Sequence, residues 1–418
     1  MHVLLRSLGR LVIALLWFSC CLVIARSQTP VPSPTPAASG FNFEDIYELA
    51  ERDNLLVNAV RRRRAVAEAE VIIAGERPNP DFITAHTRSE PKLNYSVSQL
   101  VELGGKRGRR IDVARNELRL TELELDAALR ALRHDVRAAY FGVLLARDNV
   151  DLGRDVLAQA KELADIAQAR YDAGDIAQFE VFQVNLGVSR VTNELARLEN
   201  LELVARSTLN QLLNRVPDAP LDLRDTLSLK IATVSTPDLI QQALTQNVEL
   251  KSAEQQIATE QSRLRLARAQ RVPDLTLEPG VEALDSAFTH PGFKMQVTVP
   301  VPIFNRQRGE IEKSSAMLDQ LRAERDAARQ RISAEIGRAA LNLESARKQV
   351  EFYETKLLPD AERVRQMAVE SYQAGQTGLL SVIDATRNAR DVRQAYLQAL
   401  FDYQSAVADL EQAAGVRF

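Results

Sequence analysis

The chain has 418 residues, with 53 Lys or Arg against 56 Asp or Glu and a formal net charge of −3 at pH 7. This balance lacks the basic excess that nucleic-acid binding requires, so no nucleic-acid partner is expected. Aromatic residues make up only 5% of the chain, whereas Ala, Leu, Glu, Arg and Gln are abundant, which is typical of long helices.

Residues 1–27 have the pattern of a secretory signal peptide. Arg6 and Arg10 precede an apolar run from Leu11 to Ala25, and Ala25-Arg26-Ser27 provides small residues at a cleavage position. A retained membrane anchor is the alternative, but the run is short for a full span. We therefore expect an exported chain that begins near Gln28.

Cys20 and Cys21 lie inside the apolar run and leave lipidation open. The bulky Trp17 and Phe18 just before them fit poorly with lipoprotein processing. If cleavage follows Ser27, the mature chain contains no cysteine, which excludes disulfides and thiolate metal sites.

Beyond the signal peptide, residues 28–40 form a Pro/Ser-rich linker. Residues 41–215 and 237–418 then have the same internal order, separated by an irregular connector at 216–236. Helical patterns are expected over the following segments: Phe43–Ala74, Lys106–Tyr171, Ile176–Leu213, Asp238–Gln270, Gly309–Tyr372 and Leu379–Ala414.

Four short segments between the helices alternate apolar and polar residues, which predicts strands with one apolar and one polar face. In Lys294–Val299, for example, Met295 and Val297 alternate with Gln296 and Thr298. The strand pairs are expected at about 81–103 and about 274–303: Phe82–Arg88, Asn94–Leu103, Leu275–Ala283 and Lys294–Val299.

The chain repeats itself. Ala50, Asn54, Pro80 and Asp81 return as Ala243, Asn247, Pro273 and Asp274, 193 residues later. Tyr171-Asp172-Ala173-Gly174 returns as Tyr372-Gln373-Ala374-Gly375 at an offset of 201. Several markers in one order at nearly one spacing predict a tandem duplication of helix, strand pair and long helical hairpin.

This pattern predicts a mainly α fold with a small β part. The rod from Lys106 to Tyr171 would be roughly 100 Å long, and its Gly break near 174, like the one near 375, folds it into a hairpin. Four strands cannot close a barrel, and open sheet edges are not tolerated in a bilayer. Three chains would supply twelve strands, so we expect a homotrimeric α/β barrel that contacts outer-membrane lipids.

A soluble periplasmic coiled-coil protein is the competing interpretation. Long Ala-rich helices with Gly breaks also occur in spectrin-like bundles. That interpretation accounts for the helices and the duplication, but it leaves the matching strand pairs and the export signal unexplained.

The stretches ELGGKR (102–107) and VPIFNR (301–306) each lead from a strand into a long helix. Together with the duplication they resemble TolC-like outer-membrane efflux proteins, and they look like the heavy-metal branch of CzcC- and CusC-like channels. The resemblance covers about Phe41 to Gly415. It implies a passive outer-membrane duct with a long periplasmic extension, fed by an inner-membrane RND-type pump through a periplasmic adaptor. A multidrug or type I secretion channel is the alternative within the same class.

The resemblance also implies roles for the hairpin tips. In this family the tips dock on the adaptor, and the matching positions here are Tyr171, Ala173, Gly174, Tyr372, Ala374 and Gly375. The segment SVIDAT (381–386) is similar to the aperture-lining segment, with Asp384 as its acidic residue. Ser381 departs from the acidic residue of some relatives, and Glu180 is its counterpart in the first repeat. Threefold symmetry would turn Asp384 into a carboxylate ring that attracts cations.

Basic residues crowd the starts of two helices, where they oppose the helix dipole. We expect them at the inner rim of the barrel, facing lipid headgroups: Lys106, Arg107, Arg109, Arg110, Arg306 and Arg308. The run Arg61–Arg64 is instead interpreted as solvated or paired with Glu68 and Glu70.

No motif for catalysis or for a cofactor stands out. The four histidines (His2, His86, His134 and His290) lack metal-ligand spacing, and there is no phosphate-binding loop or nucleophile elbow. We therefore expect no enzyme activity, no cofactor and no bound metal.

Overall fold

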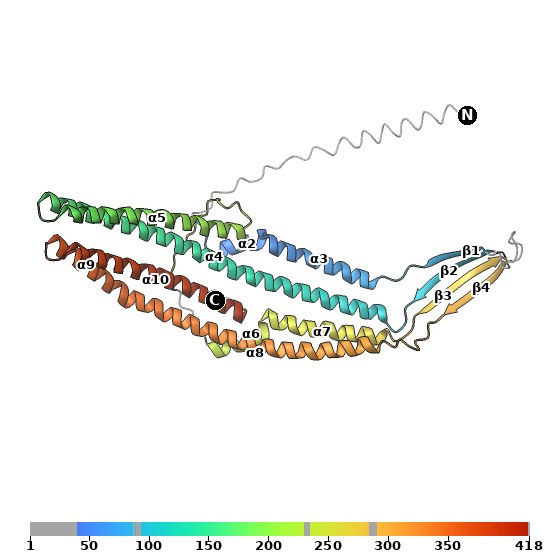
Figure 1. Cartoon of the computed structure of the whole chain (residues 1–418). Coiled ribbons are helices and arrows are strands. Elements are labelled where there is room, and N and C mark those ends of the chain that lie inside the picture. The colour runs from blue at the N-terminus through green and yellow to red at the C-terminus, as the bar shows by residue number, and fades with distance from the viewer. Residues whose placement is uncertain (1–39, 87, 89–92, 230–234, 284–290, 417–418) are drawn as a thin grey trace, which may run out of the picture. The chain divides into compact units, whose positions relative to one another are not determined.

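The computed structural model describes residues 40–86, 88, 93–229, 235–283 and 291–416. The expected signal peptide therefore lies outside the described residues. The described part is mainly α with one small sheet, which confirms the predicted fold class (Figure 1). Its helices are α2 (Phe43–Asp53), α3 (Leu55–Gly75), α4 (Lys106–Asp172), α5 (Gln178–Leu212), α6 (Thr236–Gln246), α7 (Val248–Ala269), α8 (Arg308–Phe352), α9 (Leu358–Gln373) and α10 (Leu379–Ala414). Its strands are β1 (Asp81–His86), β2 (Leu93–Val101), β3 (Leu275–Ala283) and β4 (Pro291–Thr298).

Two long helical hairpins dominate the structure, as predicted. Helix α4 has 67 residues, which corresponds to roughly 100 Å, and α5 returns along it after the turn at Gly174. The second hairpin consists of α8 and α9, followed by α10 after the turn at Gly375. Both glycines have positive φ, 82° and 70°, a conformation that residues with a Cβ rarely adopt.

A π-helical turn at Tyr353–Leu357 joins α8 to α9. Pro359 follows it in the first turn of α9. Because proline has no backbone N–H, it cannot continue the ordinary hydrogen-bond pattern, and the wider turn lets the helix pass it. The predicted rod from Gly309 to Tyr372 is therefore continuous, with a local change of helix type.

The two expected helices before the strand pairs are each broken in two, which corrects the prediction. Asn54 separates α2 from α3, and its Oδ1 accepts hydrogen bonds from the amides of Leu56 and Val57. Its Nδ2 donates to the carbonyl of Leu212 at 3.0 Å. The corresponding Asn247 separates α6 from α7 and donates to the carbonyl of Ala413, also at 3.0 Å. Each asparagine thus starts one helix and holds the end of a returning helix.

The four strands form one antiparallel sheet in the order β1-β2-β3-β4. Ile83 lies opposite Ser96 in the first strand pair, and Thr276 lies opposite Thr298 in the second. Between the pairs, Val101 lies opposite Leu275. Strands β1 and β4 are the two edges, and among the described residues neither has a second neighbour.

One face of the sheet exposes a row of apolar side chains, as the alternation predicted. The exposed members are Phe82, Tyr95, Val97, Val281, Phe293, Met295 and Val297. The opposite face is polar: the Ser96 hydroxyl donates to Glu278 at 2.8 Å, and Lys294 lies 3.9 Å from the same carboxylate. A sheet with two different faces and two open edges is not a complete structure in a single chain.

The main hydrophobic core lies where the two repeats meet, midway along the hairpins. Tyr140, Leu144 and Ile336 are fully buried there, and the Tyr140 hydroxyl donates to Asp225 at 2.7 Å. A second, smaller cluster near the tips includes Ala167, Tyr372 and Val382. Within the described residues, none of the helices combines the length and apolar character needed to cross a lipid bilayer.

Candidate functional site: hairpin tips, aperture segment and basic junction

Both hairpin tips are closed by the same backbone hydrogen bonds. At the first tip, the Gly174 amide donates to Tyr171 and the next amide donates to Arg170. At the second tip, Gly375 donates to Tyr372 and the next amide donates to Ser371. These bonds satisfy the last helical carbonyls, and the glycine supplies the left-handed residue that this turn needs. The adjoining Ala173 and Ala374 are exposed.

The two tip tyrosines have different surroundings, which the sequence did not predict. The side chain of Tyr171 is 38% exposed, whereas that of Tyr372 is 1% exposed. The Arg170 guanidinium lies 4.6 Å from the centre of the Tyr372 ring, and it donates to the Tyr372 carbonyl at 2.9 Å. Arg170 of the first tip therefore packs on the second tip and bonds to it. Burial, and next the charge of Glu180, raise the pKa of Tyr372.

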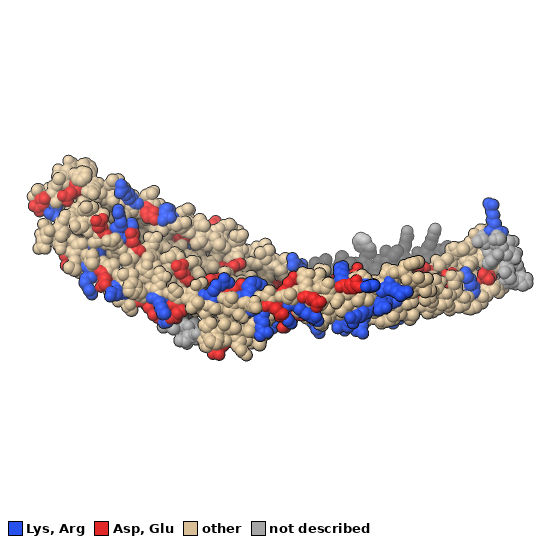
Figure 2. All heavy atoms as spheres, turned by 60° about the horizontal axis from the view of Figure 1, so that its bottom comes forward, with Lys and Arg blue, Asp and Glu red and all other residues tan. Residues whose placement is uncertain are grey.

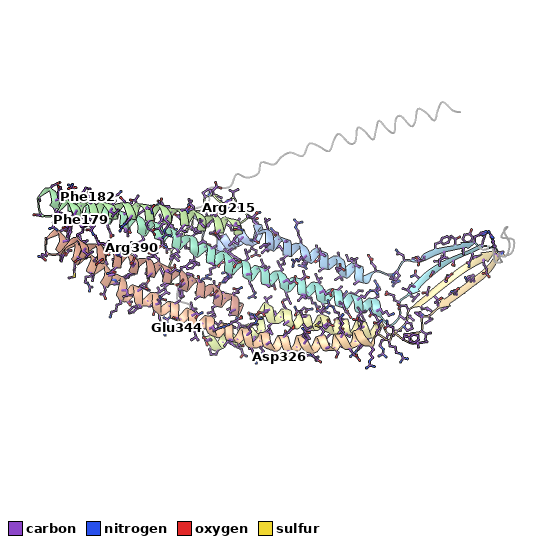
Figure 3. All side chains as sticks on the ribbon, in the orientation of Figure 1. Phe179, Phe182, Arg215, Asp326, Glu344 and Arg390 are labelled. Carbon is purple, nitrogen blue, oxygen red and sulfur yellow. The ribbon has the colours of Figure 1, made fainter. Side chains whose placement is uncertain are left out.

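Two exposed phenylalanines flank Glu180 at the start of α5. Phe179 and Phe182 are both exposed (Figure 3). Sequence reasoning missed them, although the spacing of Phe179, Phe182 and Leu186 places all three on one helix face. Exposed apolar stripes of this kind occur on surfaces that bind other proteins, membranes or ligands.

Asp384 lies on the first turns of α10 and is exposed. It borders a groove of about 440 Å³ between the two hairpins. The charged residues of that groove are four arginines and two acids: Arg190, Arg365, Arg387, Arg390, Glu162 and Asp384. Figure 3 labels Arg390 on α10. Among the described residues, Asp384, Arg190 and Arg387 form no ion pair, whereas Arg390 pairs with Asp391. Ser381 and Glu180 lie outside this lining.

At the opposite end of α4, Lys106 has a different position from the one expected. Its side chain is buried, and Nζ lies 2.7 Å from a carboxylate oxygen of Asp274. The same oxygen accepts the backbone N–H of Leu103 at 3.1 Å. Asp274 precedes β3 in the second repeat, so this contact joins the two repeats where strands become helices. The prediction that Lys106 faces lipid headgroups is therefore wrong.

The other basic residues fall into two groups. Arg107 donates to the carbonyl of Gly75 at 2.5 Å, and Arg110 forms a two-pronged pair with Glu102. Arg109, Arg306 and Arg308 form the second group: all three are exposed, as is Arg107, and Arg109 and Arg308 pair with carboxylates of their own helices, Asp112 and Glu312. Figure 2 shows Lys and Arg gathered near the region where strands meet helices, beside a mostly uncharged surface over the strands.

The histidines do not form a metal site among the residues described, where no cluster of three or more His, Cys, Asp or Glu could hold a metal ion. His86 is exposed at the end of β1, and His290 lies outside the described residues. His134 bonds two carboxylates, Asp409 at 3.0 Å and Asp135 at 3.2 Å. Of the Arg61–Arg64 run, Arg64 pairs with Glu68 at 3.1 Å.

A comparison with known protein families gives a decisive result. The family model described as "Outer membrane efflux protein" matches residues 46–215 and 239–416, which together make up most of the chain. The chain belongs to the outer membrane efflux protein family. It is accordingly an outer-membrane efflux channel protein with a periplasmic helical extension, and the family is one of transport proteins.

Curated efflux proteins resemble this family member over most of its length. It is 25% identical to the cobalt-zinc-cadmium resistance protein CzcC of Cupriavidus metallidurans, over 93% of each chain. It is 24% identical to the outer membrane protein TolC of Vibrio cholerae, over 90% of each chain. The nickel and cobalt resistance protein CnrC of Cupriavidus metallidurans is 24% identical, over 70% of this chain and 72% of that protein.

Solved structures of efflux channels share the fold. A structure of CusC matches with a TM-score of 0.74 and 17% identity, covering 90% of this chain and 92% of the CusC chain. The outer membrane protein VceC of Vibrio cholerae also matches with a TM-score of 0.74 and 17% identity, covering 90% and 96%. At such low identity, the structural match supports the fold of this efflux protein and does not identify its substrate.

Proposed function

We propose that three copies of this outer membrane efflux protein form a passive exit duct for heavy-metal cations in a tripartite efflux system. The duct has no catalytic role. An inner-membrane pump, of the proton-driven RND type, supplies the energy, and a periplasmic adaptor contacts the hairpin tips.

The open sheet carries the proposal. In the part of the chain that the structure describes, one copy presents four strands, two free edges and an apolar face. A bilayer does not tolerate free edges. Three chains would close a twelve-stranded barrel, within the known range for outer-membrane barrels. The apolar row headed by Phe82 and Phe293 would face lipid, and the polar face with Ser96, Glu278 and Lys294 would line a water-filled lumen.

The cargo is proposed from similarity and charge. CzcC, which resembles this chain over 93% of its length, is named for cobalt, zinc and cadmium resistance. Three Asp384 carboxylates around one axis would raise the local concentration of cations. The neighbouring arginines act against this effect, so Asp384 is expected to tune passage through the duct and not to bind metal tightly.

Mass and shape in detergent test the assembly. The mature protein is expected to be a trimer longer than about 100 Å, the length of α4 at 1.5 Å per residue. A stable monomer without β-sheet signal would contradict the channel assembly.

Deletion of the gene tests the cargo. A strain lacking the protein should become sensitive to cobalt, zinc, cadmium or nickel salts and keep its resistance to dyes and detergents. Complementation with the intact chain is the control. Sensitivity to dyes alone would favour the multidrug alternative.

A further inference from the structure

The polar face of the sheet carries an ion pair midway along its strands. Glu278 is the fourth residue of β3 and Lys294 the fourth of β4, and Glu278 Oε1 lies 3.9 Å from Lys294 Nζ. The Ser96 hydroxyl of β2 donates to the same carboxylate oxygen at 2.8 Å. Ser96 is buried, with 3% of its surface exposed, so this hydrogen bond holds the carboxylate in a defined position.

Gly280 leaves the space that this arrangement needs. In the strand register it lies opposite Ser96 on one side and opposite Lys294 on the other. A Cβ atom at Gly280 would lie 2.8 Å from the Ser96 Cβ and 2.8 Å from the carbonyl oxygen of Tyr95. Both distances are too short for carbon, so a side chain at this position would displace Ser96. The glycine therefore lets the side chains of β2 and β4 both approach Glu278.

Lys294 is the one Lys or Arg within the four described strands. Alternation along the strands places three carboxylates on its face of the sheet, those of Asp81, Glu278 and Glu282. Among the described residues, Asp81 and Glu282 form no ion pair. The polar face therefore has an excess of negative charge, and Lys294 offsets part of it.

The contact between Lys294 and Glu278 is loose. A distance of 3.9 Å is near the upper limit for an ion pair, and the side chain of Lys294 is 30% exposed and that of Glu278 18% exposed. Each charge therefore also acts on the solvent beside the polar face. Removal of one partner leaves the charge of the other in place, because Ser96 holds the carboxylate independently of Lys294.

We propose that Lys294 and Glu278 form a second selectivity position, inside the barrel, which sets how strongly the duct prefers hydrated inorganic cations over anions. This inference rests on the proposed trimeric channel, in which the polar face lines the lumen. Three copies would place three ammonium groups and three fixed carboxylates around one axis, and rings of charged side chains control ion passage. Lys294 lowers the cation preference that the carboxylates create.

This position is separate from Asp384. Helix α4, with 67 residues, extends from the end of the sheet to the first hairpin tip (Figure 1), and Asp384 lies in the first turns of α10, which follow the second tip. A separation of many Debye lengths screens each ring from the other. Cargo that leaves the duct would therefore meet two independent selectivity positions, one near the tips and one in the barrel.

Reversal potentials of reconstituted channels test the proposal. In a gradient of KCl near 0.1 M, Lys294→Met should raise the preference for K⁺ over Cl⁻ by about two- to fivefold, and Glu278→Gln should lower it by a similar factor. The double variant Lys294→Met/Glu278→Gln should return most of the way to the parent. All three differences should shrink near 1 M KCl, where the Debye length falls from about 10 Å to about 3 Å.

Two controls separate charge from shape and one position from the other. Gln296→Met changes the polar face directly opposite Glu278 without a change of charge, and it should leave the preference unaltered. Asp384→Ala combined with Lys294→Met should change the preference by the product of the two separate factors, because distant sites act independently.

The outcomes also distinguish this inference from the channel itself. If the pair only holds β3 to β4, both single variants lower the temperature at which trimers dissociate in detergent and leave the ion preference unchanged, and the inference is overturned. A shift of both variants in the same direction overturns it too, and in either case the trimeric duct stands. A parent protein that forms no conducting trimer overturns both proposals.

Discussion

Tyr171 and Tyr372 occupy the same place in the two repeats, yet only the second is enclosed. Its ring is covered by the guanidinium of Arg170 and belongs to the small cluster near the tips. A buried aromatic ring stabilises its surroundings by several kcal/mol, while a partly exposed one contributes much less. The tip motif was recognisable from the sequence, but this difference depends on how the hairpins pack together.

Replacing Tyr372 should therefore loosen the second tip selectively. We expect Tyr372→Ala to cost about 3 kcal/mol of local stability and to speed amide hydrogen exchange over residues 371–377. Tyr171→Ala is the matched control and should change exchange at either tip only slightly. Equal effects of the two substitutions would contradict the structural difference.

Asp384 is expected to control the passage of ions at the aperture. Asp384→Ala removes the carboxylate and should raise single-channel conductance and lower cation preference by a few-fold in reconstituted channels. Arg387→Ala, in the same groove, should shift the preference the opposite way. Unchanged conductance and selectivity in Asp384→Ala would remove Asp384 from the aperture assignment.

Some residue-level contacts could not have been read from the sequence. Lys106 and Asp274 are separated by 168 positions, and only the pairing of β2 with β3 brings them together. The sequence showed that cations at this helix start do not serve helix stability. It did not show that one of them is enclosed with a carboxylate from the other repeat.

At the scale of elements, the helix lengths were predictable and the breaks were not. The limits of α10 and the start of α4 follow from apolar periodicity and the flanking glycines. Asn54 and Asn247 lie inside segments that the periodicity predicts as continuous helices. Asparagine at equivalent positions in both repeats is, however, a capping signal. Their second contact, to the end of a returning helix, depends on tertiary packing.

His134 joins helices α4 and α10 through a contact that should depend on pH. His134 on α4 has a carboxylate oxygen within hydrogen-bonding distance of each ring nitrogen. An ionised carboxylate only accepts, so both contacts are hydrogen bonds only when the ring is protonated and both nitrogens donate. Burial alone would lower the pKa of His134, but the hydrogen bonds and charges of Asp409 and Asp135 outweigh it and the pKa is raised.

The stability from this contact should be complete below about pH 6.5, the ordinary pKa of histidine. It should be lost as the pH rises through the higher folded-state value, with a total effect below about 1 kcal/mol. Thermal unfolding measured across this range would detect it. His134→Gln, which cannot gain charge, should flatten the profile, and an unchanged pH profile in that variant would exclude the contact.

At the scale of the whole molecule, the sequence alone indicates a subunit that is incomplete without further copies. Duplicated strand pairs, an expected export signal and long hairpins together argue against most soluble folds. The sequence does not identify the cargo, because a duct wall does not need a tight binding site. The residues that line the groove beside Asp384 carry both signs of charge.

The basic residues at the junction between strands and helices should have two different roles in the assembled protein. Arg109→Gln with Arg306→Gln removes exposed cations and should reduce insertion into membranes that contain anionic lipid, with little change in trimer stability. Lys106→Gln leaves the partly buried Asp274 with the Leu103 amide but without its cationic partner, and should destabilise the fold by about 1–3 kcal/mol. Flotation with vesicles and unfolding in detergent measure the two effects, and similar profiles for both variants would argue against the division.

The enclosed Tyr372 has a consequence for stoichiometry. Three chains would display six turns of two alternating kinds: three in which Arg170 covers Tyr372, and three in which Tyr171 is partly exposed. The adaptor would then meet two classes of docking position, three of each, which differ in how firmly the contacted turn is held.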